Sequence, residues 1–401
     1  MARIAIDLKE GKVSNPQDFI IGIDLGTTNS LVAYVKDGQP VAVRGKNGER
    51  TLVPSIVHFS ETRQILVGDE AKAHLVTHPE RTIYSVKRLM GKSYRDVENF
   101  SHSFGYQIID DDPESLVKIR VGDKFFTPIE LSAEILKYLK KRIESALDSP
   151  ISKAVITVPA YFNDSQRQAT RDAGKLAGLD VLRIVNEPTA ASLAYGLGQT
   201  NHQSPITNHQ TIAVYDLGGG TFDISILRIE EGIFEVLSTN GDTFLGGDDF
   251  DRAIVDFWLE KNGLENRAFV SDKSLSQKLR LKAEEAKKAL SVSELFSEEM
   301  EGLDCTIHRT EFENLIQPFV EKTIQCCRLA LKDAKLGTEK IDAVVMVGGS
   351  TRTPLIKNSV AEFFGKPVFD QLDPDEEVAL GAAIQPDVLA GKQKDVLLLD
   401  I

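Results

Sequence analysis

The feature that most constrains the fold is a repeated pattern in which an apolar strand ends in an aspartate followed by a glycine-containing turn. Residues 21–30 read IGIDLGTTNS and residues 212–223 read IAVYDLGGGTFD. In each segment, hydrophobic residues lead into an aspartate, Asp24 or Asp216, and glycine and threonine follow. A duplicated unit of this kind predicts two similar halves whose turns face each other across one cleft.

Composition narrows the class of protein. The 401 residues are 42% hydrophobic and 27% charged, which is typical of a globular protein with two or three domains. A net charge of −13 argues against a nucleic-acid-binding face, and no apolar run is long enough to cross a membrane. The three cysteines form neither a disulfide framework nor a zinc site. We therefore expect a cytoplasmic protein with no nucleic-acid or membrane partner.

Hydrophobic periodicity predicts an α/β architecture. Short runs rich in valine and isoleucine alternate with longer segments whose apolar residues recur at three- and four-residue spacing. The expected strands are 20–25, 30–35, 154–158, 211–217, 224–229 and 343–347. The expected helices are 131–147, 164–177 (capped by Asn163 or Asp164), 275–290 and 311–334.

The two turns have the chemistry of a site for a polyphosphate with a metal ion. Glycine lets backbone N–H groups approach an anion, and threonine adds hydroxyl donors. Asp24 and Asp216 repel a bare phosphate, so a cation must lie between them and it. Magnesium suits this role, because it combines few carboxylates with water and phosphate oxygens. A third glycine turn, VGGSTR at 347–352, follows another apolar strand, and Arg352 there is a candidate to stack on a base.

Eight segments together resemble the signature blocks of the heat shock protein 70 chaperone family. In order, they are GIDLGTTNS, SVKRLMG, ITVPAYFND, NEPTAASLAYG, YDLGGGTFDIS, LGGDDFD, VGGSTR and DVLLLD. The resemblance spans residues 20–400. It implies a two-lobed, actin-like α/β ATPase, in which each lobe has a ribonuclease-H-like mixed sheet and a smaller subdomain.

The resemblance also implies a division of the chain. We expect an N-terminal extension at 1–19 and lobe I at 20–205, with its small subdomain at about 56–130. Lobe II follows at 206–392, with its small subdomain at about 246–322. Residues 393–401 resemble the start of an interdomain linker, and the family's substrate-binding domain is absent from the sequence.

The site residues carried over from the family fall into three groups. The cofactors implied are ATP or ADP with Mg²⁺, and K⁺ as an additional cation. Lys87 is expected to reach the γ-phosphate and the attacking water, Glu187 to orient that water, and Asp24 and Asp216 to hold hydrated Mg²⁺. The phosphates are expected to contact Gly26, Thr27, Thr28, Asn29, Gly218, Gly219, Gly220 and Thr221, the last also in a catalytic role. The nucleoside is expected to contact Gly246, Gly247, Glu284, Lys287, Ser291, Gly348, Gly349, Ser350, Arg352 and Asp375. Pro159 and Arg167 resemble the family's nucleotide-sensing switch.

The branch of the family is predicted from a short segment. The segment after KKALS, residues 292–315, is shorter than the corresponding segment in general members of the family. In this respect the chain resembles the HscA-type chaperone of iron–sulfur cluster assembly. That resemblance implies a monomer that works with an HscB-like J-domain co-chaperone and an IscU-like scaffold protein, and depends little on a GrpE-like exchange factor. A general DnaK-type chaperone is the alternative. A small-molecule kinase of the actin superfamily and a filament-forming protein are more distant ones.

Overall fold

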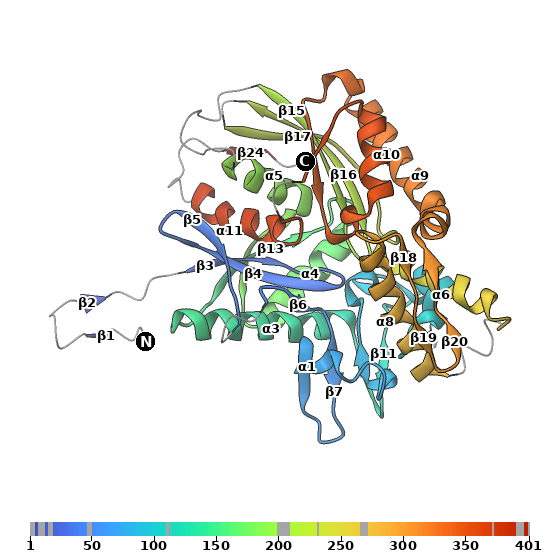
Figure 1. Cartoon of the computed structure of the whole chain (residues 1–401). Coiled ribbons are helices and arrows are strands. Elements are labelled where there is room, and N and C mark those ends of the chain that lie inside the picture. Colours follow the sequence, from blue (N-terminus) through green and yellow to red (C-terminus); the bar gives the residue numbers. More distant parts are fainter. Residues whose placement is uncertain are drawn as a thin grey trace.

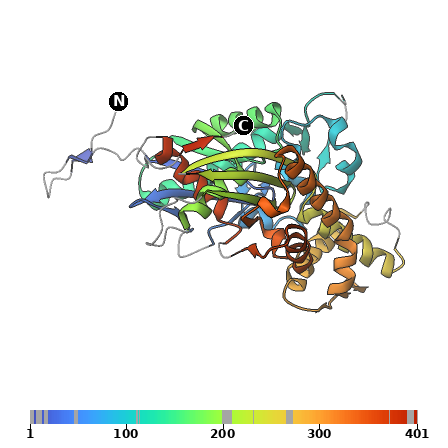
Figure 2. The same cartoon turned by 90° about the horizontal axis from the view of Figure 1, so that it is seen from above.

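The computed structural model describes most of the chain. The described residues are 5–6, 13–14, 19–45, 50–109, 112, 114–198, 209–230, 232–264, 272–370, 373–389 and 397–399. Strand β1 (Ala5–Ile6) pairs antiparallel with β2 (Val13–Ser14), and this short ladder lies apart from the two lobes (Figures 1 and 2). Most of the expected N-terminal extension and the expected division at 205/206 lie outside the described residues.

A six-stranded mixed sheet forms the centre of lobe I, by which we mean described residues 19–198. Its order is β14-β13-β3-β4-β5, with β6 beside β4. The neighbours β14, β13 and β3 are parallel, whereas β3, β4 and β5 are antiparallel. The strands are β3 (Ile20–Asp24), β4 (Asn29–Lys36), β5 (Gln39–Ala42), β6 (Val53–Pro54), β13 (Lys153–Val158) and β14 (Asp180–Asn186).

The sheet of lobe II, from residue 209 onward, repeats this arrangement. Its order is β23-β22-β15-β16-β17-β24, again with a parallel side at β23, β22 and β15 and an antiparallel side at β15, β16 and β17. The last strand, β24, pairs in parallel with β17 at the sheet edge. The strands are β15 (Gln210–Leu217), β16 (Phe222–Glu230), β17 (Ile233–Asp242), β22 (Ala343–Val347), β23 (Val368–Phe369) and β24 (Leu397–Leu399).

Helices cover the outer face of each sheet (Figure 1). In lobe I these are α3 (Pro128–Leu147) and α4 (Asp164–Leu176). In lobe II they are α9 (Arg309–Asp333) and α10 (Pro354–Phe364), which lie beside the short helices η5 (Thr338–Lys340) and η6 (Gly349–Arg352). The two-lobed α/β architecture expected from the sequence is therefore confirmed.

Two helices between the sheets join the lobes (Figure 1). Helix α5 (Glu187–Gly198), from the end of lobe I, packs on the sheet of lobe II, and α11 (Glu377–Leu389), from lobe II, packs on the sheet of lobe I. A Cβ at Gly381 would lie 1.7 Å from the Ala190 carbonyl oxygen, so the two helices touch through their backbones. The buried cluster here draws side chains from both sheets and both helices, so this joint is one packed unit.

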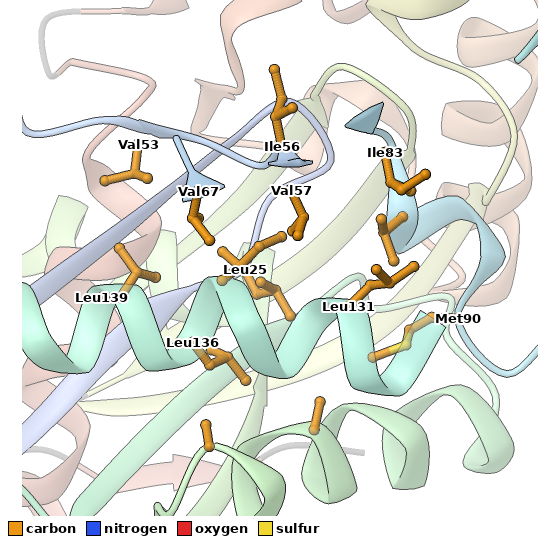
Figure 3. Packing of buried hydrophobic residues seen from close by; sticks show 14 of the residues in the cluster. Leu25, Val53, Ile56, Val57, Val67, Ile83, Met90, Leu131, Leu136 and Leu139 are labelled. Atoms are coloured by element: carbon orange, nitrogen blue, oxygen red, sulfur yellow. The ribbon is translucent and has the colours of Figure 1, made fainter. Parts of the chain in front are cut away.

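Helix α3 shows how the sequence pattern builds the core of lobe I. Thr127 accepts from the Glu130 amide, and the Glu130 carboxylate accepts from the Thr127 amide, which fixes the first turn. Leu131, Leu136 and Leu139 then recur on one face and are fully buried. Figure 3 shows them pointing into the apolar side chains of the neighbouring strands and of α4.

A small subdomain extends from each lobe beside the cleft. The one in lobe I contains β7 (Val57–Phe59), β8 (Ile65–Val67), β9 (Thr82–Ile83), β10 (Gln107–Ile108), β11 (Ile119–Val121), β12 (Lys124–Phe126), α1 (Asp69–Lys72), α2 (Tyr94–Val97), η2 (Pro79–Arg81), η3 (Val86–Leu89) and η4 (Glu98–Ser103). The one in lobe II contains α6 (Gly247–Lys261), α8 (Lys273–Leu290), β18 (Leu295–Phe296), β19 (Glu299–Met300), β20 (Leu303–Asp304) and β21 (Ile307–His308).

The expected strands and helices all form, with ends that differ from the expected ones by at most three residues. Helix α4 resolves one alternative, because the side chain of Asn163, not that of Asp164, accepts from the Gln166 amide at its N-terminus. Across the part of the chain that the structure describes, no helix combines the length and apolar character needed to cross a membrane.

Candidate functional site

The two Asp–Gly turns meet in a single cavity of about 640 Å³ between the lobes. Asp24, at the end of β3, and Asp216, in β15, both line it, so the carboxylates of opposite lobes share one hollow. This is the juxtaposition that the duplication predicted. The predicted site residues that line the cavity are Asp24, Gly26, Thr27, Thr28, Asn29, Lys87, Glu187, Asp216, Gly218, Gly219, Thr221, Glu284, Lys287, Ser291, Gly348, Gly349, Ser350, Arg352 and Asp375.

The two turns touch each other directly. A Cβ added to Gly219 would lie 1.9 Å from the Thr28 hydroxyl oxygen, and one on Gly220 would lie 2.5 Å from the Thr27 methyl group. A glycine is therefore needed at 219, because only the absence of a side chain lets the turns of opposite lobes approach this closely.

Hydrogen bonds to backbone carbonyl oxygens hold both turns in place. In lobe I, the Ser55 hydroxyl donates to the Gly26 carbonyl oxygen at 2.7 Å. In lobe II, the Ser350 hydroxyl donates to the Gly218 carbonyl oxygen at 2.9 Å, and the Gly247 amide donates to the same oxygen at 3.0 Å. The turns are thus held before any ligand arrives, which lowers the cost of ordering them on binding.

Three predicted glycines lie behind the cavity wall. Gly220, Gly246 and Gly247 are not among the residues that line the cavity. A Cβ on Gly246 would lie 2.5 Å from the Gly219 carbonyl carbon and the Gly220 amide nitrogen. These residues support the glycine turn at 218–221 through their backbones, and their predicted contact with nucleotide stays a prediction.

Lys87 and Glu187 form a buried ion pair in the cavity. The Lys87 ammonium, in η3, donates to Glu187 Oε1 at 2.5 Å, and both side chains are at most 7% exposed. Burial opposes the charge on Lys87, but the carboxylates of Glu187 and Asp24 outweigh it and raise the pKa of the ammonium. Lys87 is therefore a fixed cation beside the two Asp–Gly turns.

The cavity holds more buried acid than this single ammonium can neutralise. Burial raises the pKa of Asp24 and of Asp216, and it raises the pKa of Glu187 to about 8, with neighbouring carboxylates adding to the shift at each. A divalent cation between Asp24 and Asp216 would balance this surplus, and oxygen donors of this kind suit Mg²⁺. The donor set therefore fits the expected metal ion. Two carboxylates leave most coordination positions to water and phosphate, and among the described residues no group of three or more acidic, histidine or cysteine side chains is arranged to hold a metal.

Hydrogen bonds connect the acidic cluster to the segment that contains Pro159 and Arg167. Thr157, just before Pro159, donates to Asp24 at 3.0 Å, and the Tyr161 amide donates to Asp223 at 2.9 Å. Arg167 donates to the Ala160 carbonyl oxygen at 3.0 Å. These contacts connect both lobes to the proposed switch, whose function stays a prediction.

Candidate nucleoside residues on α8 and just after it also line the cavity. The Lys287 ammonium donates to the Gly247 carbonyl oxygen at 2.9 Å and pairs with Asp251 at 2.8 Å. Burial opposes the charge on Glu284, but Lys288 and Lys287 outweigh it and lower the pKa of its carboxyl to about 2. Glu284, Lys287 and Ser291 all line the cavity, and their spacing of three and four residues puts them on one face of the helix, while their predicted contact with a nucleoside stays a prediction.

The third glycine turn completes the wall. Gly348 has φ = +84°, and a Cβ there would lie 2.4 Å from the Leu217 carbonyl oxygen, so this position requires glycine. The Arg352 guanidinium donates to Asp373 at 2.8 Å and to Asp375 at 2.9 Å. It is thus oriented at the rim of the cavity, while its predicted contact with a base stays a prediction.

Sequence reasoning missed several residues that shape the site. Ser55, Asp223, Asp248 and Asp251 were not singled out, although three of them lie within or next to the quoted segments YDLGGGTFDIS and LGGDDFD. Arg88 donates from Nε to the Gly220 carbonyl oxygen at 3.0 Å and pairs with Asp249. Only its position beside Lys87 in the chain could have indicated it.

Comparisons with known proteins agree with this geometry. The family model described as "Hsp70 protein" matches residues 20–401. A relative from Carsonella ruddii (strain PV), the "Chaperone protein DnaK", is 47% identical over 399 aligned positions. That alignment covers 95% of this chain and 65% of the relative, so the chain spans about two thirds of the relative's length. The HscA-type assignment is not confirmed by these matches. Hsp70 proteins are ATPases with an actin-like fold, which supports the expected activity class. The chain belongs to the Hsp70 family.

Proposed function

We propose that this chain is the nucleotide-binding domain of a molecular chaperone and that it binds ATP with Mg²⁺ in the cavity between the lobes and hydrolyses it slowly. The observation that carries the proposal is the meeting of two Asp–Gly turns from opposite lobes around the buried Lys87–Glu187 pair. Phosphoryl transfer needs positioning and charge stabilisation more than covalent chemistry, and this arrangement supplies both.

Each residue has a specific task in the proposed reaction. The turns at 26–29 and 218–221 cradle the phosphates, and Asp24 and Asp216 hold the hydrated metal. When bound, Mg²⁺ supplies positive charge against the phosphate oxygens. Lys87 places its ammonium where negative charge develops, and Glu187, fixed by Lys87, aligns the attacking water. Because both are anchored, little reorganisation is needed as the reaction proceeds.

The test is ATP hydrolysis with the Lys87→Ala variant. We expect turnover to fall at least about 100-fold, since one positioned charge is worth roughly that much. Nucleotide binding should persist, because the turns and Asp216 are intact. Lys92→Ala, on the same segment but outside the cavity lining, is the control. Normal turnover in Lys87→Ala would show that the lysine takes no part in the reaction and would contradict the proposal.

The family match supports a J-domain co-chaperone as partner and a cytoplasmic monomer that acts on client proteins through a domain beyond this chain. The pairing of β24 (Leu397–Leu399) with β17 supports a role for the last residues as a linker that docks on lobe II. Added strands of this kind recognise the sheet edge through backbone hydrogen bonds.

We infer a general DnaK-type client range, because the DnaK relative is nearly half identical. The HscA-type alternative, with HscB-like and IscU-like partners, rests on the short segment after α8. In the structure this segment forms two nested antiparallel ladders, in which β18 pairs with β21 and, between them, β19 pairs with β20. ATPase assays with a J-domain protein decide between the two. Stimulation by unfolded peptides supports the general branch, whereas stimulation that requires a cluster-scaffold protein supports the specialised one.

A further inference from the structure

Three histidines gather in the small subdomain of lobe I. His58 lies in β7, and His74 and His78 lie in the connection between α1 and η2. The His58 and His74 rings stack with centroids 4.0 Å apart, and the His78 ring centroid lies 5.7 Å from each of them. None of the three is among the residues that line the cavity, and they are not arranged to hold a metal ion. We call these three residues the histidine cluster.

Hydrogen bonds to Thr82, in β9, determine which nitrogen of His58 carries a hydrogen. The Thr82 hydroxyl donates to the His78 carbonyl oxygen at 2.7 Å and lies 3.2 Å from the His74 carbonyl oxygen. Because a hydroxyl has a single hydrogen, Thr82 Oγ1 must accept from His58 Nδ1, which lies 2.9 Å away. Nδ1 of His58 therefore carries a hydrogen, and Nε2 is the atom that can take up a second proton.

The cluster connects segments that are distant in the chain. His58 and Thr82 lie opposite each other in the antiparallel pairing of β7 with β9, and their side chains are also hydrogen-bonded. The His78 amide donates to the His74 carbonyl oxygen at 2.9 Å, so a single hydrogen-bonded turn carries the other two rings. After β9 the chain runs directly into η3, which contains Lys87. The cluster thus anchors the segment that leads to the candidate site.

A second proton on His58 would introduce a charge with nothing to neutralise it. The residue is 3% exposed, and the groups that act on its charge are His74, His78 and Arg81 of η2, each of which is a cation or can become one. Burial and these neighbours lower the pKa of His58 to about 4 from its ordinary value of 6.5. Between these two values an opened segment takes up a proton that the closed cluster does not, so the closed form loses stability as pH falls.

We propose that the histidine cluster is a pH-sensitive contact, which holds β7, β9 and the connection between α1 and η2 together at neutral pH and releases them in acid. The driving force is the cost of a buried charge and its repulsion by the stacked His74 ring, because His58 Nδ1 keeps its hydrogen bond in both protonation states. The first segment to loosen is the one that precedes η3, while the sheets of both lobes stay intact. The inference requires no ligand and is independent of the proposed function.

The experiment is native-state hydrogen exchange followed by mass spectrometry at pH 7.5 and pH 5.0, with a chelator in both buffers. Exchange rates are divided by the intrinsic rate at each pH, which gives an opening constant for each peptide. For peptides that contain β7 or residues 72–84, the opening constant should rise about 30-fold from pH 7.5 to pH 5.0, the factor that a pKa of about 4 against 6.5 implies. Peptides from β15 and β16 provide the reference for the whole domain.

Three variants separate the cluster from other effects of acid. His58→Asn keeps an amide nitrogen that can donate to Thr82 in place of Nδ1, but it cannot take up a proton. His74→Gln keeps His58 and removes the ring stacked on it. The matched control is His308→Gln, which alters an exposed histidine at β21 in the small subdomain of lobe II.

We expect nearly equal opening constants at the two pH values in His58→Asn, a smaller increase than the wild type in His74→Gln, and the wild-type increase in His308→Gln. A 30-fold increase that persists in His58→Asn would overturn the proposal. An equal increase in the β15 and β16 peptides of the wild type would also overturn it, since acid would then loosen the whole domain. If His58→Asn is already open at pH 7.5, the His74→Gln variant decides, and a full wild-type increase there would contradict the proposal.

Discussion

Glu377, at the start of α11, is expected to make the domain less stable as pH rises. Its side chain lies in the joint between the lobes and is 1% exposed. Neither carboxyl oxygen has a hydrogen-bond partner among the residues that the structure describes. Burial, with a smaller contribution from the Asp373 carboxylate, raises the pKa of Glu377 to about 8, whereas its ordinary value is 4.5. The folded state therefore favours the protonated, neutral acid.

The size and direction of the effect follow from these two values. Between pH 4.5 and pH 8 the folded protein keeps a proton that the unfolded chain has lost, so the free energy of unfolding falls as pH rises. The raised pKa reduces the free energy of unfolding by about 1 kcal/mol at pH 5 and by about 3 kcal/mol at pH 7, and the reduction levels off near 5 kcal/mol above pH 8. Glu377→Gln removes the charge but keeps the shape, so it should remove this part of the pH dependence.

The assay is urea unfolding of the wild type and Glu377→Gln between pH 5 and pH 9, followed by circular dichroism. From pH 5 to pH 7, the free energy of unfolding of Glu377→Gln should rise by about 2 kcal/mol relative to that of the wild type. Glu362→Gln, which alters an exposed glutamate of α10, is the control. If the difference between the wild type and Glu377→Gln does not change with pH, the carboxyl is not held in its neutral form and the reasoning fails.

Three further changes test the site. Asp24→Asn should raise the Mg²⁺ concentration needed for half-maximal nucleotide binding at least about tenfold, because it removes one of two carboxylates beside the metal; an unchanged magnesium titration would contradict the metal assignment. Glu187→Gln should slow single-turnover hydrolysis about 100-fold with nucleotide affinity retained, since only water alignment is lost; a normal rate would remove that role. Gly219→Ala should weaken ADP binding, measured by calorimetry, at least about tenfold, because its Cβ would lie 1.9 Å from Thr28. Gly218→Ala, whose Cβ would have its nearest contact at 3.8 Å, should lose less ADP affinity. Equal losses of affinity in the two variants would argue against contact between the turns.

The sequence predicted those parts of the fold that depend on local patterns or on repetition. The duplicated Asp–Gly turns predicted that Asp24 and Asp216 share one cavity, and the family resemblance indicated Glu284, Lys287 and Ser291, which line it. Contacts between distant segments could not be predicted in this way. Nothing near Glu377 in the sequence distinguishes it from an ordinary acidic residue at an exposed helix N-terminus, because its burial results from the packing of α11 between the lobes.

The same limit applies to Tyr84, Gln277 and Arg280. Gln277 and Arg280 have the composition of an ordinary polar helix surface, and Tyr84 reads as one more apolar residue before SVKRLMG. Their contact depends on how the two lobes pack, over a separation of 193 residues between Tyr84 and Gln277. Motif strings identify residues by type and order, so they miss pairings that the packing of the lobes creates.

The exchange of α5 and α11 between the lobes has a consequence for biosynthesis. As the polypeptide emerges from the ribosome, the first sheet is complete by residue 186, but the helix that covers its inner face begins only at Glu377. That apolar surface stays uncovered until about 190 further residues have been made. Nascent chains arrested between these points should expose it to other cellular proteins, and the two halves expressed as separate polypeptides should each depend on the other to become soluble.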